Sequence, residues 1–155
     1  MTAYRLRIKF DPDPTSLWRD IVVGESRTLD ELQSAVNPAF GLDDDHLWFF
    51  GEGEDYWNST VKYQRPEEHE DLPSGEGRLL NPEEETFNAG EKTVGDMIGR
   101  LELERGDRSC YLYDYGDEWR LYAILKERLD DEPDAAEPEV VGGKGDEIDQ
   151  YGYSI

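Results

Sequence analysis

The segment from Tyr4 to Phe10 alternates apolar and basic residues, and this pattern constrains the fold more than any other feature. Side chains two residues apart lie on the same face of a strand, so a period of two predicts a strand with one buried face. Two prolines at positions 12 and 14 predict a turn, and the apolar segment 17–23 predicts a second strand paired with the first as a hairpin. The first strand's expected core residues are Tyr4, Leu6, Ile8 and Phe10.

A capped helix is expected directly after this hairpin. Thr28 and Glu31 have the spacing of a capping box, in which each side chain bonds a backbone N–H at the start of a helix. Apolar residues then follow at helical spacing from position 29 to position 40. Pro38 and Gly41 predict the end of this helix.

Four more strand-like segments and a shorter helix follow. Aromatic and apolar residues predict strands at 46–50, 55–64, 108–115 and 119–128, the last two joined by a turn at 116–118. Thr93 and Asp96 predict a short capped helix. Residues 65–92 are acidic and rich in Gly and Pro, which predicts a long irregular connection with a short strand at Arg78–Leu80.

The order of these elements predicts an α+β fold. We expect a β-grasp-like α/β roll, in which one main helix and one short helix cover a mixed sheet. A split ferredoxin-like sandwich is the alternative, but it needs a helix after the first strand. The expected division is one domain over residues 1–129, including the long acidic loop at 65–92, and an acidic, partly disordered tail at 130–155.

The charge of the chain indicates its environment. Asp and Glu number 38 against 16 Lys and Arg, a formal net charge of −22, which disfavours direct binding to nucleic-acid phosphates. The cations are 11 Arg and only 5 Lys, and acidic residues occur in every segment. This pattern is typical of proteins from halophiles that accumulate potassium chloride, where salt screens self-repulsion. The alternative is a mesophilic protein with an acidic face for a basic partner.

The sequence also indicates where the protein works. The first residues contain no apolar signal-peptide core, and no apolar stretch approaches the ~20 residues of a membrane span. We therefore expect a cytoplasmic protein without membrane association. The single cysteine, Cys110, cannot form an internal disulfide and lies in a strand-like segment, which favours a packing role.

The densest pattern of aromatic and acidic residues lies at positions 111–119, Tyr-Leu-Tyr-Asp-Tyr-Gly-Asp-Glu-Trp. Its tyrosines at 111, 113 and 115 would share one face of a strand. Asp114 and Asp117 would either accept backbone N–H groups in the turn, which we favour, or line a small binding site with Trp119. His46 follows three aspartates, but no metal-ligand spacing is present, which favours an acidic loop over a metal site. The candidate binding residues are His46, Tyr113, Asp114, Asp117 and Trp119.

The same segment resembles the hallmark of the plasmid pRiA4b ORF-3-like family, an aromatic-rich strand followed by Asp-Phe-Gly-Asp, a variable residue and Trp. The resemblance covers Tyr4 to Leu129. Many members have His where this chain has Leu121, and a Cys-containing C-terminal segment that is absent here. The resemblance implies an α/β roll and no established activity, and the family's names reflect a mobile-element context. Further matches, in family order, are Trp18-Arg19, Thr28-Leu29 with Leu32, Gly41, His46-Leu47, Phe50 and Thr93–Ile98.

Three hypotheses of function follow. The first is a non-catalytic interaction module with an unknown protein partner in a halophile cytoplasm. The second is an accessory protein of mobile-element or DNA metabolism, which the charge opposes unless Arg5, Arg7 and Lys9 present a local basic face. The third is an acidic-site hydrolase or metal-binding protein that uses His46, Asp114 and Asp117. No phosphate loop or catalytic motif occurs, so we predict no catalytic residue and no cofactor, and the oligomeric state is left open.

Overall fold

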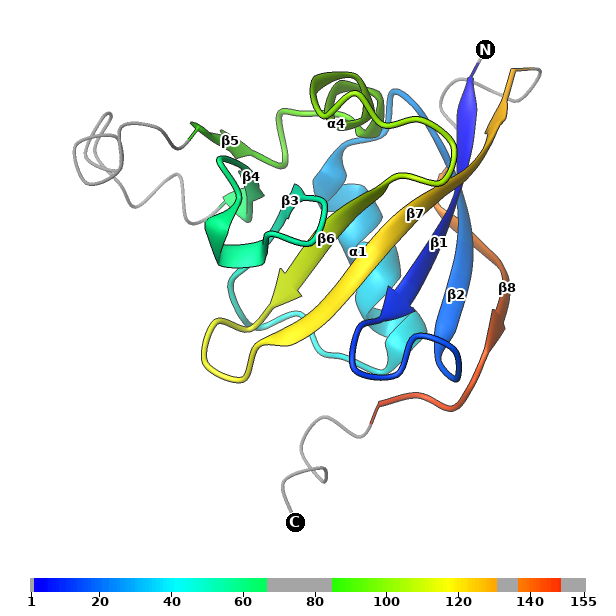
Figure 1. Cartoon of the computed structure of the whole chain (residues 1–155), viewed down its shortest axis with the longest axis vertical. Coiled ribbons are helices and arrows are strands. Elements are labelled where there is room, and N and C mark those ends of the chain that lie inside the picture. Colours follow the sequence, from blue (N-terminus) through cyan, green and yellow to red (C-terminus); the bar gives the residue numbers. More distant parts are fainter. Residues whose placement is uncertain (1, 67–84, 131–136, 149–155) are drawn as a thin grey trace.

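The computed structural model describes residues 2–66, 85–130 and 137–148. Within these ranges, eight strands form one sheet in the order β5-β4-β3-β6-β7-β1-β2-β8 (Figure 1). The strands are β1 (Ala3–Phe10), β2 (Trp18–Gly24), β3 (Trp48–Glu52), β4 (Val61–Gln64), β5 (Glu85–Asn88), β6 (Arg108–Tyr113), β7 (Trp119–Leu129) and β8 (Glu139–Lys144). The helices are α1 (Leu29–Phe40), the 3₁₀ helix η1 (Tyr56–Asn58) and α4 (Val94–Arg100).

The sheet is mixed, because β5 runs parallel to β4 while the other neighbouring pairs are antiparallel. The expected α+β fold, with a mixed sheet covered by one main and one short helix, is confirmed. In the described ranges, none of the helices has the length and apolar character to cross a membrane.

Strand β1 lies between β2 and β7 and shows the alternation that its sequence predicts. Tyr4, Leu6, Ile8 and Phe10 are all buried, and the basic residues between them are half-buried on the other face. Because residues directly opposite one another in a sheet share a face, the pairing of β1 also fixes the orientation of its neighbours.

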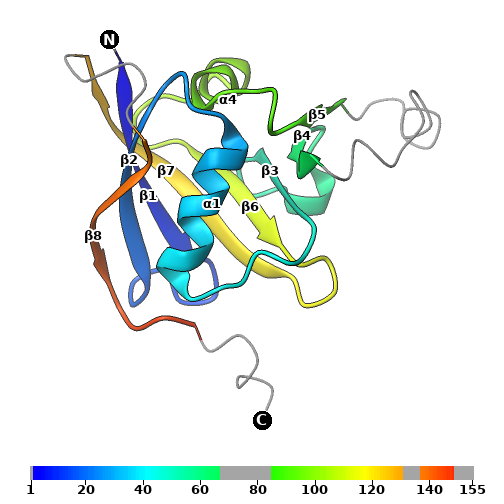
Figure 2. The same ribbon diagram turned by 180° about the vertical axis from the view of Figure 1, so that it is seen from behind.

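Helix α1 lies across one face of the sheet (Figure 2). Its predicted capping box is present, with the Thr28 side chain accepting from the N–H of Glu31. Pro38 lies inside the last turn, and the helix ends at Gly41, where φ is 78°. A residue without a Cβ adopts this left-handed conformation at little cost, which explains why Gly41 rather than Pro38 ends the helix. The helix buries Leu29, Leu32, Val36 and Phe40 against the sheet.

The structure differs from the prediction at two places between residues 55 and 92. The predicted strand at 55–64 is divided into η1 and β4, and residues 85–88 form β5 on the edge of the sheet. Phe87 stacks on Tyr63 with ring centroids 5.3 Å apart, and this contact attaches β5 to the core. The predicted strand at Arg78–Leu80 lies outside the described residues.

The acidic C-terminal segment also contains a strand that its composition does not indicate. Residues 139–144 form β8, whose backbone pairs with β2. Arg19 reinforces this pairing by donating to the carbonyls of Lys144 at 2.8 Å and Gly145 at 2.9 Å. Because β8 is held through its backbone while its side chains stay exposed, a hydrophobic pattern cannot reveal it.

Candidate functional site

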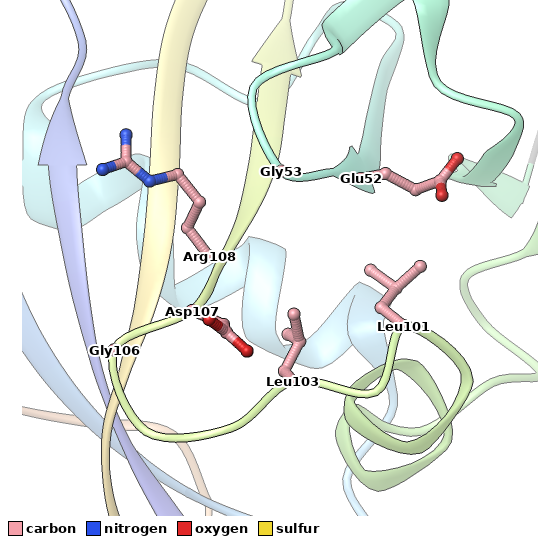
Figure 3. A pocket seen from close by; sticks show the side chains of 7 residues that line it. All are labelled: Glu52, Gly53, Leu101, Leu103, Gly106, Asp107 and Arg108. Atoms are coloured by element: carbon pink, nitrogen blue, oxygen red, sulfur yellow. The ribbon is translucent and has the colours of Figure 1, made fainter.

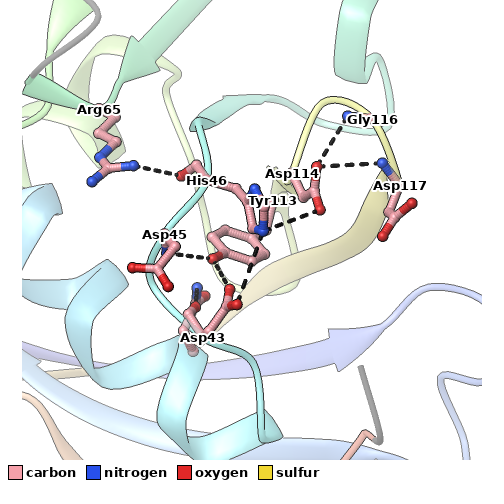
Figure 4. A network of polar contacts seen from close by, with 9 residues as sticks. Asp43, Asp45, His46, Arg65, Tyr113, Asp114, Gly116 and Asp117 are labelled. Atoms are coloured by element: carbon pink, nitrogen blue, oxygen red, sulfur yellow. Dashed lines mark hydrogen bonds and ion pairs between the residues drawn. The ribbon is translucent and has the colours of Figure 1, made fainter. Parts of the chain in front are cut away.

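The hairpin between β6 and β7 is built around Asp114. This residue has φ of 65°, and its Oδ1 accepts the N–H of Gly116 at 3.1 Å and of Asp117 at 3.4 Å (Figure 4). Its own N–H donates to the carbonyl of Leu47 at 2.8 Å. An Asp side chain that accepts backbone N–H groups of its own turn stabilises the left-handed conformation, which is otherwise unfavourable for a residue with a Cβ. The geometry around Asp114 is that of a turn-forming residue.

The conformation of Asp114 changes the face on which the next tyrosine lies. Tyr111 and Tyr113 face the main core, as alternation predicts. Tyr115 instead packs on the other side of the sheet, with its ring 4.8 Å from Trp57 and 6.0 Å from Phe49. The expectation that all three tyrosines share one face is therefore wrong, because a left-handed residue interrupts the alternation of the strand.

Tyr113 and His46 join this hairpin to the loop that follows α1. The hydroxyl of Tyr113 donates to the Asp43 carboxylate and accepts the N–H of Asp45 at 2.9 Å (Figure 4). The Nε2 atom of His46 lies 3.7 Å from Asp114 Oδ2 and 3.9 Å from Asp43 Oδ2. Burial is the main cause that raises the pKa of Tyr113, and its hydrogen bond to Asp43 adds to it. These contacts hold the loop and the hairpin together.

Side-chain contacts join three of the five candidate residues, His46, Tyr113 and Asp114. Asp117 is exposed on the outside of the turn. Trp119 is half-buried and lies opposite Tyr113 in the β6–β7 register, and its ring packs against Phe10 with ring centroids 6.2 Å apart. Across the described part of the chain, no group of three or more His, Cys, Asp or Glu side chains is placed to hold one metal ion.

Cys110 lies within a second, smaller apolar cluster on the side of the sheet opposite α1. Its side chain is buried beside Phe49, Tyr56 and Leu112. Burial raises the pKa of the Cys110 thiol, which keeps the sulfur protonated and a poor nucleophile.

The face of the sheet opposite α1 gathers basic side chains, of which the sequence alone indicates only those of β1. Figure 1 looks onto this face and Figure 2 onto the side of α1. In the register, Arg7 lies between Asp20 and Ile124, and Ile124 in turn lies opposite Arg108. The central strands β6, β7, β1 and β2 therefore place basic side chains from distant segments on one surface.

We call this surface the arginine face. On this face, the positions of β1, β2, β6 and β7 carry two carboxylates, Asp20 and Glu127. In the chain as a whole, acidic residues exceed basic ones by 38 to 16. The charge balance of the chain is thus reversed at these positions. The residues that define the arginine face are Arg5, Arg7, Lys9, Trp18, Arg108, Arg120 and Tyr122.

Three guanidinium groups of the arginine face stack on aromatic rings. Arg7 lies 4.0 Å from the ring centroid of Trp18, and Arg108 lies 4.2 Å from that of Tyr122. Arg120 lies 4.7 Å from the ring of Tyr56 in η1. Such cation–π contacts fix the plane of a guanidinium group while its N–H groups remain able to bind carboxylates.

An open cavity of about 360 Å³ lies at one end of the arginine face (Figure 3). It is bounded by the loop between α4 and β6 and by the turn that follows β3. Leu101 and Leu103 give it an apolar wall, and Arg108 and Asp107 add opposite charges. The lining residues are Glu52, Gly53, Leu101, Leu103, Gly106, Asp107 and Arg108.

The comparisons with known proteins agree with this fold. A family model described as plasmid pRiA4b ORF-3-like protein matches residues 2–150. A crystal structure of a protein of unknown function from Methanosarcina mazei Go1 superposes with a TM-score of 0.64 at 18% sequence identity. The alignment covers 98% of this chain and 77% of that one, and at this identity it speaks to the fold alone. The search of curated proteins finds no match.

Proposed function

This chain belongs to the plasmid pRiA4b ORF-3-like family, and we propose that it is a non-catalytic interaction module that binds a protein partner through the arginine face. The observation that carries this proposal is the set of three guanidinium groups held over aromatic rings on the side of the sheet opposite α1. Arginine and aromatic residues are the types most enriched at protein interfaces.

The stacked arginines favour binding because they lose little freedom when a partner arrives. An unrestrained arginine side chain loses about 1.5–2 kcal/mol of rotamer freedom when it is fixed. A ring beneath the guanidinium restricts its orientation beforehand, so less of this entropy is lost on association. Tyr122 and Tyr56 are themselves buried, which makes them rigid supports for Arg108 and Arg120.

The candidate cluster around His46 supports the non-catalytic part of this proposal. The Tyr113 hydroxyl and the Asp114 carboxylate both bond backbone N–H groups of the surrounding loop and turn. Groups with these partners hold two segments in place, which is a sufficient account of their position. We accordingly do not assign the acidic-site hydrolase or metal-binding hypothesis to these residues.

The setting that we propose is the cytoplasm of a halophile. A net charge of −22 with few lysines is best tolerated where salt screens repulsion between the carboxylates. A second candidate function is an accessory role in mobile-element or DNA metabolism. The arginine face favours this second candidate, since Arg5, Arg7 and Lys9 form a local basic surface on β1.

The proposed function is tested by site-specific photo-cross-linking in cells of the native host. A benzophenone amino acid replaces Lys9 on the arginine face or, as a control, the exposed Ser34 on α1. We expect a discrete protein adduct from position 9 and none from position 34. Adducts from position 34 alone, or no protein adduct from position 9, would overturn the proposal.

A further inference from the structure

The arginines of the arginine face already hold carboxylates from their own chain. Arg7 binds Asp20 through two parallel bonds, Nε to Oδ1 at 2.8 Å and Nη2 to Oδ2 at 3.0 Å. Arg108 binds Glu54 at 2.9 Å and Arg120 binds Glu118 at 3.0 Å. Three independent pairs thus show that the geometry of these guanidinium groups suits a carboxylate.

These three pairs differ in how easily an external group could replace the internal carboxylate. The Asp20 side chain is only 7% exposed, which makes its pair with Arg7 part of the folded structure. The side chains of Glu54 and Glu118 are 76% and 40% exposed. Exposed ion pairs contribute little to stability, so replacing Glu54 by a partner's carboxylate costs little. Glu118 also accepts the Trp57 Nε1–H at 2.8 Å, so a partner's carboxylate there has to accept from both Arg120 and Trp57.

The two replaceable sites lie on neighbouring strands at a defined spacing. Arg108 is level with Ile124 and Arg120 with Leu112, so four residues of β7 separate the two levels. The Arg108 guanidinium lies over the ring of Tyr122, two residues from Arg120 on β7, so it points toward the Arg120 site. Since side chains two or four residues apart share one face of an extended chain, carboxylates at alternate positions of a peptide match this arrangement.

Nucleic acid fits the same surface less well. Base stacking requires an open aromatic face, whereas the rings of Trp18, Tyr122 and Tyr56 are covered by guanidinium groups. Binding to a polyphosphate chain also depends on the release of its condensed counterions, so it weakens steeply as salt rises.

We propose that the partner presents an extended acidic segment, with carboxylates at alternate positions that replace Glu54 at Arg108 and Glu118 at Arg120. This inference rests on the proposed function and specifies the chemistry of the partner. The apolar wall of the adjoining cavity, Leu101 and Leu103, would then contact an apolar residue at one end of that segment.

Fluorescence anisotropy with three labelled probes tests this inference. The probes are a twelve-residue peptide with Glu alternating with Thr, the same peptide with Lys in place of Glu, and an oligo-dT of equal charge to the acidic peptide. Each is titrated with the full chain at 0.2 M and 2 M KCl. We expect the acidic peptide to bind at both salt concentrations and the other two to bind at least tenfold more weakly.

Matched variants locate the binding. Each charge-assisted bond that is lost should weaken binding about tenfold, so R108Q and R120Q are each expected to lose about that factor. The control is R128Q on strand β7. The Arg128 side chain is 63% exposed, and its ion pair in the described part of the chain is with Asp130, which is also exposed. R128Q should bind within twofold of the unaltered chain, and all variants should keep its circular dichroism spectrum.

The outcomes separate this inference from the proposed function. Absence of acidic-peptide binding, equal loss in R108Q and R128Q, or tighter binding of oligo-dT would each overturn the acidic partner. If the cross-link at position 9 then persists, the interaction module stands with a partner of different chemistry. If the cross-link at position 9 and acidic-peptide binding are both absent, the proposed function itself is contradicted.

Discussion

Replacing Arg7 by Gln tests whether the ion pair at the centre of the arginine face maintains the sheet. Asp20 is 7% exposed, and Arg7, which is 24% exposed, gives it two hydrogen bonds. Removing one partner of a fully buried pair costs about 3–5 kcal/mol, because the remaining charge is left without compensation.

Two features of the structure reduce this cost for Arg7. Its side chain is one quarter exposed, so water reaches the site, and Arg5 Nη1 lies 3.6 Å from Asp20 Oδ2 and retains part of the attraction. We therefore expect R7Q to lower the free energy of unfolding by about 2–3 kcal/mol. For a chain of this size the melting temperature should fall by roughly 4–12 °C.

The assay is thermal and urea unfolding followed by circular dichroism at constant KCl. The matched control is R5Q on the same strand, because the ion pairs of Arg5 within the described ranges are the longer ones, 3.6 Å to Asp20 and 3.8 Å to Glu127. That variant should lose no more than about 1 kcal/mol. An R7Q protein as stable as R5Q would refute the reasoning, since the two bonds to Asp20 would then contribute nothing.

Three further predictions concern salt, alkali and the hairpin. The melting temperature should rise between 0.1 M and 2 M KCl because salt screens the net charge of −22, and a flat or falling value would contradict the halophile setting. Burial raises the pKa of Tyr63 to about 12. The stability that the protonated Tyr63 hydroxyl contributes is complete below about pH 10, the pKa in the unfolded chain, and is lost as pH rises through about 12. Y63F should therefore show a shallower alkaline unfolding curve than the unaltered chain. D114A should lower the free energy of unfolding by about 1–2 kcal/mol, because Ala keeps the unfavourable φ of 65° but loses two turn hydrogen bonds, whereas D114N, which retains an acceptor, should lose less than half as much in urea unfolding.

Features that depend on neighbouring residues could be predicted from the sequence. The alternation of β1 is visible because each buried residue is two positions from the next, and both capping boxes are visible because Thr and its acidic partner are three positions apart. These local signals were sufficient for the fold class, since a hairpin followed by a capped helix and further strands restricts the arrangements that can bury one core.

Features that depend on pairing between distant segments could not be predicted. Strand β8 joins the sheet through the backbone of β2 and the carbonyls that Arg19 binds, and neither leaves a pattern in residues 139–144. The arginine face has the same origin. Arg5, Arg7 and Lys9 are recognisable as one basic strand face, but only the register of β6, β7 and β1 adds Arg108 and Arg120 to it.

The most direct test of the arginine face as the binding surface is to observe its guanidinium groups during binding. In ¹⁵N-labelled protein, the arginine Nε–H signals are assigned by single Arg→Lys replacements and followed during titration with the acidic peptide. We predict progressive shifts of the Arg108 and Arg120 signals, with Arg128 unchanged. Shifts confined to Arg128 or Arg27, which binds Glu31 on the side of α1, would contradict the account.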